Sequence, residues 1–114
     1  MTNILLALAC LLSIESGGND YPPDGDGGRA VGCLQIWPIM VAECNRIAGV
    51  PDRWTLDDRR DPQESRQMAL VFLRYHYRRG VTDPAKLALR WNRPGGQDNE
   101  AYRRRIERWM EARR

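Results

Sequence analysis

The sequence lacks the cysteine patterns that hold small domains together through disulfides or zinc. Its 114 residues include three cysteines, Cys10, Cys33 and Cys44, with no CxxC pair and one histidine in the whole chain. An odd count without these spacings favours neither a disulfide framework nor a metal site, although one disulfide plus one free thiol fits the count. We interpret the three cysteines as small buried hydrophobic residues, and we expect no metal and no cofactor.

The chain also lacks a hydrophobic run long enough to cross a membrane. Its apolar stretch "ILLALACLLSI" has 11 residues, whereas a membrane-spanning helix needs roughly 20. The stretch imitates a signal peptide, but residues 2 and 3 carry no positive charge and it continues directly into Glu15. Both features argue against a cleaved leader. We therefore expect the first core helix here, with no transmembrane segment and no export signal in the chain.

Internal repeats and continuous strand signals are absent as well. With 42% hydrophobic and 29% charged residues, the composition is that of an ordinary globular protein, and the length suits one domain over residues 1–114 with a modest core. We predict a mainly α fold. In this fold a central, buried first helix is accompanied by a glycine-rich loop or small β-hairpin that lines a cleft, and we expect a monomer.

Turn residues divide the rest of the chain into helices. Asp61, Pro62 and Glu64 fit an N-cap, a first-turn proline and the partner glutamate of a capping box. Residues 17–32 hold six of the ten glycines and predict a long loop or irregular hairpin. The expected helices cover residues 3–16, 38–48, 62 to just before 80, a short segment that starts at 84, and a last segment from about 99.

The last helix, in "AYRRRIERWMEARR", alternates arginine with glutamate and contributes to the net charge of +3. Such a pattern is typical of a solvated helix face, and in second place of a patch attracted to a polyanion such as nucleic acid or an anionic cell wall. No helix-turn-helix or aromatic ribonucleoprotein motif accompanies it, so we do not expect a nucleic-acid partner.

Glu15 closes the apolar run at a position that suggests chemistry. Ile4, Leu8 and Leu11 precede it at spacings of four, three and four, so all four residues share one helical stripe. Burial and the negative end of the helix dipole would both raise the pKa of the carboxyl group. A protonated carboxyl group can act as a general acid. Alternatively, the helix ends one residue early and Glu15 reaches solvent.

Four segments occur in an order that resembles a known superfamily. "IESGGN", "GDGGRAVGCLQI", "LALRWNRPGG" and "AYRRRIERW" together are similar to the motif set of lysozyme-like proteins, specifically soluble lytic transglycosylase domains and goose-type lysozymes. The similarity spans roughly residues 4–108. It implies a mostly helical fold and cleavage of the β-1,4 bond between N-acetylmuramic acid and N-acetylglucosamine in peptidoglycan.

The resemblance also implies roles for particular residues. It makes Glu15 the catalytic acid, Ser16 a group that hydrogen-bonds near the reacting sugar, and Gln35 a residue of the cleft. Asn92 falls in the segment that matches the family's "YNAGPG" loop, and Tyr102 matches a tyrosine close to the catalytic carboxylate. Trp91 replaces the usual tyrosine of that loop and "RPGG" replaces "AGPG". A tryptophan at this position could still stack on a pyranose ring.

The number of carboxylates separates two reactions. Hydrolysis with inversion usually needs a second carboxylate about 6.5–9.5 Å from the acid. The loop offers Asp24 and Asp26, and Asp26 resembles the loop aspartate of goose-type lysozymes, although an aspartate before a glycine is also a common turn residue. A lytic transglycosylase uses its glutamate alone and forms a 1,6-anhydro end. We favour the transglycosylase and keep hydrolysis by Glu15 with Asp26 as the alternative.

Other residues permit other readings. Trp37 and Trp91 flank the motif segments and are the preferred stacking candidates, whereas Trp54 and Trp109 fit helix packing equally well. His76 has no acidic or cysteine neighbour at ligand spacing, which favours a packing role.

A catalytically inactive module that binds glycan, or that is part of a phage or secretion apparatus, also remains open. The expected place of action is the bacterial cell envelope, on peptidoglycan glycan strands. The protein would be phage-encoded, carried by a larger machine or separately exported.

Overall fold

Five α-helices make up most of the part of the chain that the structure describes, which confirms the predicted mainly α fold. The computed structural model describes residues 2–92 and 99–114. The helices are α1 (Thr2–Ser16), α2 (Pro38–Ala48), α3 (Pro62–Arg78), α4 (Pro84–Asn92) and α5 (Glu100–Glu111), with short 3₁₀ turns η1 (Asp26–Gly28) and η2 (Leu56–Arg60).

Side-chain caps fix where the later helices begin. The Asp61 carboxylate accepts the backbone N–H groups of Gln63 and Glu64 at 2.8 and 3.2 Å, as expected for an N-cap. The second half of the predicted capping box is wrong. Instead of reaching back to the cap, the Glu64 carboxylate accepts the indole N–H of Trp54 at 3.1 Å, because Trp54 is buried and its donor needs a partner.

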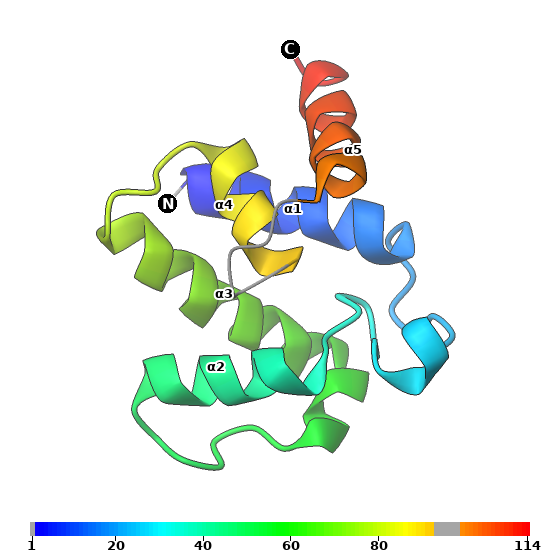
Figure 1. The fold of residues 1–114 in the computed structure, drawn as a ribbon, viewed down its shortest axis with the longest axis vertical. Helices are drawn as coiled ribbons and strands as arrows, with labels where there is room; N and C mark the ends of the chain where they lie inside the picture. Colours follow the sequence, from blue (N-terminus) through cyan, green and yellow to red (C-terminus); the bar gives the residue numbers. More distant parts are fainter. Residues whose placement is uncertain (1, 93–98) are drawn as a thin grey trace.

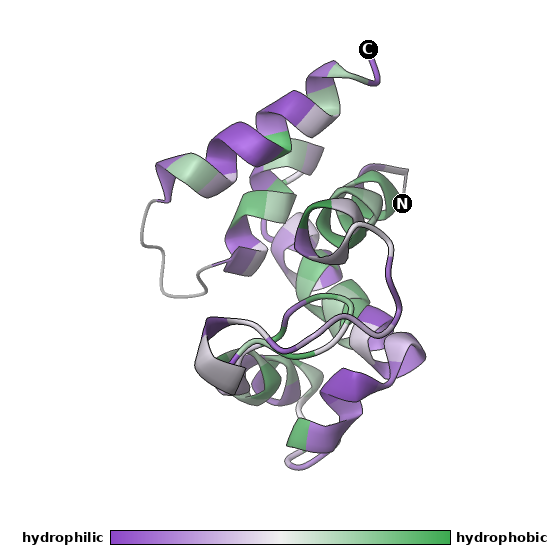
Figure 2. Cartoon of the chain, turned by 90° about the vertical axis from the view of Figure 1, so that its right-hand side faces the viewer, coloured by the Kyte–Doolittle hydropathy of each residue, from purple (hydrophilic) through white to green (hydrophobic). Residues whose placement is uncertain are grey.

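α1 lies in the middle of the molecule and contacts α3, α4 and α5. In Figure 1, α5 lies above it, α4 crosses it in the view, and α3 and then α2 lie below it. In Figure 2, α1 is largely green, which marks hydrophobic residues, whereas α5 is largely purple, which marks hydrophilic residues. These colours fit a central α1 and a peripheral α5. The predicted central, buried first helix is only partly buried, because Leu5 is 51% exposed and Ala9 and Ser13, one and two turns later, are exposed too.

The cysteines behave as the buried hydrophobic residues that we predicted. Cys10, Cys33 and Cys44 are all free and buried. Burial raises the pKa of the Cys10 thiol to about 11 and that of Cys44 to about 12, so both remain neutral thiols at physiological pH. Their part in the fold is to fill the core between the helices.

The glycine-rich segment folds as an irregular loop with two short pairings. Isolated antiparallel bridges join Gly25 to Ala30 and Val31 to Ile36, and residues 2–92 and 99–114 contain no longer strand. This result agrees with the predicted loop or small hairpin. The loop connects the end of α1 to the start of α2, and it places residues 24–36 beside the C-terminal end of α1 (Figure 1).

Candidate functional site

Glu15 lies in the last turn of α1 on the stripe that the sequence predicted. Ile4, Leu8 and Leu11 are 4%, 8% and 0% exposed. The helix continues to Ser16, so the alternative in which it ends before Glu15 is wrong. Gly17 and Gly18 then stop the helix with φ of 62° and 83°, a left-handed conformation that glycine adopts without strain.

Burial is the largest influence on the acidity of Glu15. It raises the pKa of the carboxyl group from 4.5 to about 7, against the lowering effects of the Tyr102 hydroxyl and the Arg105 charge. The negative charge of Asp26 adds a small further increase in this pKa. Near neutral pH, Glu15 is thus divided between its protonated and ionised forms, which suits a group that must both give and take a proton.

Tyr102 touches Glu15 directly. Its hydroxyl donates a hydrogen bond of 3.0 Å to Oε2 of Glu15, and its ring is 4% exposed. Burial and the neighbouring carboxylate raise the pKa of Tyr102 far above its usual range, so the phenol keeps its proton. Tyr102 can therefore act as a permanent donor that holds the carboxylate in one orientation.

A chain of hydrogen bonds places Tyr102 beside the acid. Asn99, the N-cap of α5, accepts the backbone N–H of Tyr102 at 3.2 Å. The Nδ2 group of Asn99 donates to Oδ1 of Asn92 at 3.1 Å. Asn92, which the resemblance implies to be a substrate-binding residue, is thus linked to Glu15 through the start of α5. The "RPGG" segment that follows it, residues 93–96, lies outside the described residues.

Arg105 is a functional candidate that the sequence did not single out. Its guanidinium donates to the backbone carbonyl of Ile14, and its charge lowers the pKa of Glu15. It thereby joins α5 to the carbonyl-rich end of α1, where a cation is favourable. In "AYRRRIERW" three consecutive arginines look alike, so only the helix packing distinguishes Arg105 from its neighbours.

The two loop aspartates have different surroundings. Arg60 donates to both carboxylate oxygens of Asp24, at 3.0 and 3.1 Å, and this bond lowers the pKa of Asp24. The exposed Asp26 has φ of 51°, and its carboxylate forms no hydrogen bond or ion pair with the residues that the structure describes. Because the charge of Asp26 acts on Glu15, Asp26 is the better candidate for a second carboxylate.

Gln35 helps to shape the loop. Its Nε2 group donates to the carbonyls of Gly32 and Pro23 at 3.0 and 3.4 Å. Its Oε1 atom lies so close to Gly25 that a Cβ there would come within 2.4 Å. The amide donor of Gln35 is therefore engaged in holding the loop. The cleft role that the resemblance implies for Gln35 stays a prediction.

Arg59, which the sequence also did not single out, fastens the same loop from η2. The side chain is 8% exposed. Its Nη1 group donates to the carbonyls of Arg29 and Ile36, both at 3.0 Å, and its Nε group to that of Leu56 at 2.7 Å. A buried guanidinium needs several acceptors to offset its lost hydration. Arg59 therefore ties both ends of residues 29–36 to η2.

One of the two predicted stacking tryptophans needs revision. The Trp91 side chain is 3% exposed. Its indole N–H donates to the Leu34 carbonyl at 3.4 Å, and its ring meets Phe72 edge-on at 5.3 Å. This burial does not fit the expected stacking on a sugar, because Trp91 fills the core between α3, α4 and the loop. Trp37 is 38% exposed and stays a stacking candidate.

Ser16 forms a local bond. Its hydroxyl donates to the Leu12 carbonyl, one turn earlier, at 3.1 Å. The hydroxyl oxygen can still accept a bond, so the role near the sugar that the resemblance implies stays a prediction.

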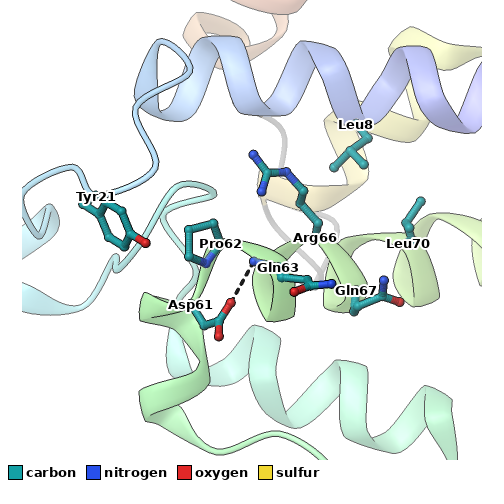
Figure 3. Close-up of a pocket in the computed structure, with 8 residues that line it drawn as sticks. All are labelled: Leu8, Tyr21, Asp61, Pro62, Gln63, Arg66, Gln67 and Leu70. Atoms are coloured by element: carbon teal, nitrogen blue, oxygen red, sulfur yellow. Dashed lines mark hydrogen bonds between the residues drawn. The ribbon is translucent and has the colours of Figure 1, made fainter.

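A hollow of about 570 Å³ lies between α1 and the start of α3. Figure 3 shows Leu8 and Leu70 on its apolar side, with Tyr21 on the loop across from them. Its charged groups already have partners, since Arg66 pairs with Asp20 at 3.1 Å and Asp61 caps α3. None of the site residues predicted from the sequence lines this hollow.

Comparisons with protein-family models, with curated proteins and with solved structures give no match to this chain. Within residues 2–92 and 99–114, no helix is both long and apolar enough to span a membrane. The same residues contain no cluster of three or more histidine, cysteine or acidic side chains that could hold a metal ion. The geometry around Glu15 therefore provides the argument about function.

Proposed function

We propose that the protein has a lysozyme-like fold and cleaves peptidoglycan at the β-1,4 bond between N-acetylmuramic acid and N-acetylglucosamine, with Glu15 as the general acid. The observation that carries the proposal is the environment of Glu15. Its pKa is raised to about 7 at the end of the central helix, and the Tyr102 hydroxyl holds its carboxylate at 3.0 Å. The order of the motifs around Glu15, Asn92 and Tyr102 supports the same reading. The proposed place of action is the bacterial cell envelope.

In the first step, protonated Glu15 gives its proton to the glycosidic oxygen. The bond between that oxygen and C1 of the muramic residue breaks, and the N-acetylglucosamine side leaves as an alcohol. C1 becomes electron-poor, as in other glycosidases. Glu15 is then a carboxylate, stabilised by the Tyr102 hydroxyl bond and by the positive charge of Arg105.

In the second step, the Glu15 carboxylate removes the proton from the C6 hydroxyl of the same muramic residue. The freed oxygen attacks C1 and closes a 1,6-anhydro ring, and Glu15 is protonated again. One group serves as acid and then as base, which requires a pKa near the working pH. The value of about 7 meets that requirement at neutral pH.

Hydrolysis is the alternative, and Asp26 is the observation that favours it. The charge of Asp26 acts on Glu15, and the exposed carboxylate could activate a water molecule that attacks C1. The product would then be a reducing muramic end. In this reaction both Glu15 and Asp26 would be required.

Digestion of purified peptidoglycan tests both reactions. Wild type, Glu15→Gln and Asp26→Asn are incubated with the polymer, and the released fragments are weighed by mass spectrometry. A transglycosylase gives anhydro fragments, one water lighter than hydrolytic products, and Asp26→Asn remains active. A hydrolase gives reducing ends, and both variants lose at least about a hundredfold in rate.

Two variants serve as controls. Glu107→Gln removes an exposed carboxylate of α5, and Asp24→Asn alters the other loop aspartate; both are expected to keep the wild-type rate within about threefold. If wild type releases no fragments across the pH range, the enzyme proposal is wrong. An inactive glycan-binding module would then have to bind the polymer without cutting it.

A further inference from the structure

Asn99 uses both ends of its side-chain amide to join two helices. Its Oδ1 atom accepts the backbone N–H of Tyr102 at 3.2 Å and caps α5. Its Nδ2 group donates to Oδ1 of Asn92, the last residue of α4, at 3.1 Å. A backbone N–H can only donate, so the first bond identifies the oxygen of the Asn99 amide. The second bond then identifies the oxygen of Asn92 as its acceptor, and both amides are fixed in orientation.

The cap of α3 shows what a helix start needs by itself. Asp61 accepts the backbone N–H groups of Gln63 and Glu64, and a carboxylate offers no donor. Asparagine, aspartate and serine cap helices about equally well, so capping alone does not require the N–H group of Asn99. An amide carries its acceptor and its donor on separate atoms. Asn99 can therefore cap α5 and reach α4 at the same time.

The residue that Asn99 caps is the one that touches the acid. Tyr102 is the third residue of α5, and its hydroxyl donates to Oε2 of Glu15 at 3.0 Å. The N–H groups in the first turn of a helix have no acceptor within the helix, so a turn without its cap frays. Fraying at this turn would displace the backbone that carries the Tyr102 ring. Asn99 thus acts on Glu15 through a single intervening residue.

The other bond of Asn99 orients Asn92. The resemblance implies that Asn92 contacts the substrate, and its side chain is half-buried. Because its Oδ1 atom is engaged with Asn99, its Nδ2 group is the donor that remains for a ligand. Such a donor suits the hydroxyl or N-acetyl oxygens of a glycan. Without the bond, the amide of Asn92 could rotate and present either end.

We propose that Asn99 is a positioning residue of the cleavage site. One of its bonds keeps the Tyr102 hydroxyl on Glu15, and the other keeps Asn92 in the orientation from which it contacts the glycan. α1, α4 and α5 all contact one another, so one side chain at the start of α5 can serve groups on the other two helices. The second role rests on the proposed function, whereas the first needs only the contact between Tyr102 and Glu15.

The ionisation of Glu15 reports the first role. Burial raises the pKa of Glu15, and the groups that act on this pKa are Tyr102 and Arg105 of α5 and Asp26 of the loop; none comes from α3 or α4 as far as the structure describes the chain. The Tyr102 bond lowers the pKa. In a carbon-13 NMR titration, Asn99→Ala should raise the Glu15 midpoint by about half a pH unit, because the bond is weakened without being removed.

Three further variants complete this titration. Asn99→Ser keeps a capping oxygen and should keep the wild-type midpoint. Asp61→Ala removes the cap of α3, a matched loss at a helix that supplies no group to Glu15, and should leave the midpoint in place. If Asn99→Ala does not fold, Asn99→Gly removes the same two bonds at a smaller cost to the helix start and replaces it. An unchanged midpoint without the Asn99 side chain, or an equal shift in Asp61→Ala, would overturn the first role.

Binding of short peptidoglycan glycan strands reports the second role. Affinity is measured by calorimetry in a Glu15→Gln background, so that no cleavage interferes. Asn99→Ser lacks the Nδ2 group, and we expect it to bind about fivefold more weakly although its Glu15 midpoint is unchanged. In an Asn92→Ala background the same substitution should have no further effect, because the bond partner is already gone. Unchanged affinity in Asn99→Ser, or an equal loss in both backgrounds, would overturn the second role.

The two measurements also separate this inference from the enzyme proposal. A raised midpoint in Asn99→Ala, in a protein that releases no peptidoglycan fragments, would refute the enzyme proposal and leave the link between Asn99 and Glu15 intact. Fragment release by wild type, together with an unchanged midpoint in Asn99→Ala, would refute this inference alone.

Discussion

Neighbouring groups have opposing effects on the ionisation of Glu15. Burial raises its pKa to about 7, while the Tyr102 hydroxyl and Arg105 oppose the rise. From the sequence, the stripe of Ile4, Leu8 and Leu11 was enough to predict burial. The donor and the cation come from α5, and no local pattern around residue 15 could reveal them. The burial of Glu15 could therefore be predicted from α1 alone. Its final pKa also depends on Tyr102 and Arg105 of α5.

The raised pKa of Glu15 predicts a loss of stability with increasing pH. Below about pH 4.5 folded and unfolded chains both hold the proton, so Glu15 imposes no penalty. Between pH 4.5 and about 7 the unfolded chain releases the Glu15 proton while the folded chain keeps it, so stability falls by about 3 kcal/mol over this window and is constant above it. Glu15→Gln removes this loss. In urea denaturation, we expect the variant to gain about 3 kcal/mol relative to wild type between pH 4 and pH 8.

The exposed Glu107→Gln variant is the control for this measurement. Its stability should follow that of wild type across the whole range. If the Glu15→Gln and wild-type curves run parallel from pH 4 to pH 8, Glu15 ionises as freely in the folded chain as in the unfolded chain. That result would contradict the buried environment described here.

Tyr102→Phe is expected to raise the pKa of Glu15 further. The hydroxyl bond stabilises the carboxylate, and a hydrogen bond to a charged group is worth about 1.5 kcal/mol, or about one pH unit. A carbon-13 NMR titration of the Glu15 carboxyl group should show the midpoint move to higher pH by roughly that amount. Tyr77→Phe, on α3, should leave the midpoint in place. A shift to lower pH in Tyr102→Phe would contradict the assigned donor.

At the scale of elements, capping residues explain why helix boundaries were predictable. Asp61 and Asn99 bond the first N–H groups of α3 and α5, and Gly49 ends α2 with φ of 72°. These are local interactions, so the sequence contains them in full. The loop of residues 25–36 differs, because its shape depends on Arg59 of η2 and on Gln35. Its glycines predicted irregularity without predicting which residues would fasten it.

Gly32→Ala should disrupt this loop more than another substitution of the same kind. Gly32 has φ of +82°, and an added Cβ would lie 1.8 Å from the Arg59 carbonyl oxygen. Gly28 has a comparable φ of +92°, with nothing within 4 Å of an added Cβ. We expect Gly28→Ala to cost about 1–2 kcal/mol from the left-handed conformation alone. Gly32→Ala should cost about 2 kcal/mol more.

Urea denaturation gives both values, with far-ultraviolet circular dichroism as the check that each variant still folds. Equal losses in the two variants would show that the close approach of Gly32 to η2 is absent in solution. The hydrogen bonds from Arg59 to the carbonyls of Arg29 and Ile36 would then not hold the loop against η2.

At the scale of the whole molecule, Trp91 joins parts that are distant in sequence. It belongs to α4, packs on Phe72 of α3 and donates to Leu34 of the loop. The sequence placed it beside Asn92 in a motif segment, which favoured a sugar contact. Its burial follows from where α4 packs on α3, and a motif alone does not contain that information. Trp37, near the start of α2, has the exposure that Trp91 lacks.

Alanine substitutions at the two tryptophans should therefore have different effects. Trp91→Ala is expected to cost about 3–5 kcal/mol in the free energy of unfolding, because it leaves a large cavity in the core. Trp37→Ala should change that free energy by less than about 1 kcal/mol. If Trp37 stacks on a sugar, the variant should bind glycan fragments several-fold more weakly. Chemical denaturation and fragment binding by calorimetry separate the two effects, and equal losses of stability would contradict the different burial of the rings.

By itself, the sequence determined the helices, the buried stripe that ends at Glu15 and the burial of the three cysteines, because periodicity, caps and hydrophobicity act over a few neighbouring residues. The tertiary structure alone decided that Arg105 reaches the end of α1 beside Glu15 and that Trp91 belongs to the core. Each of these depends on how helices from separate parts of the chain pack together. That packing sets distances and ion pairs between residues that no local pattern connects.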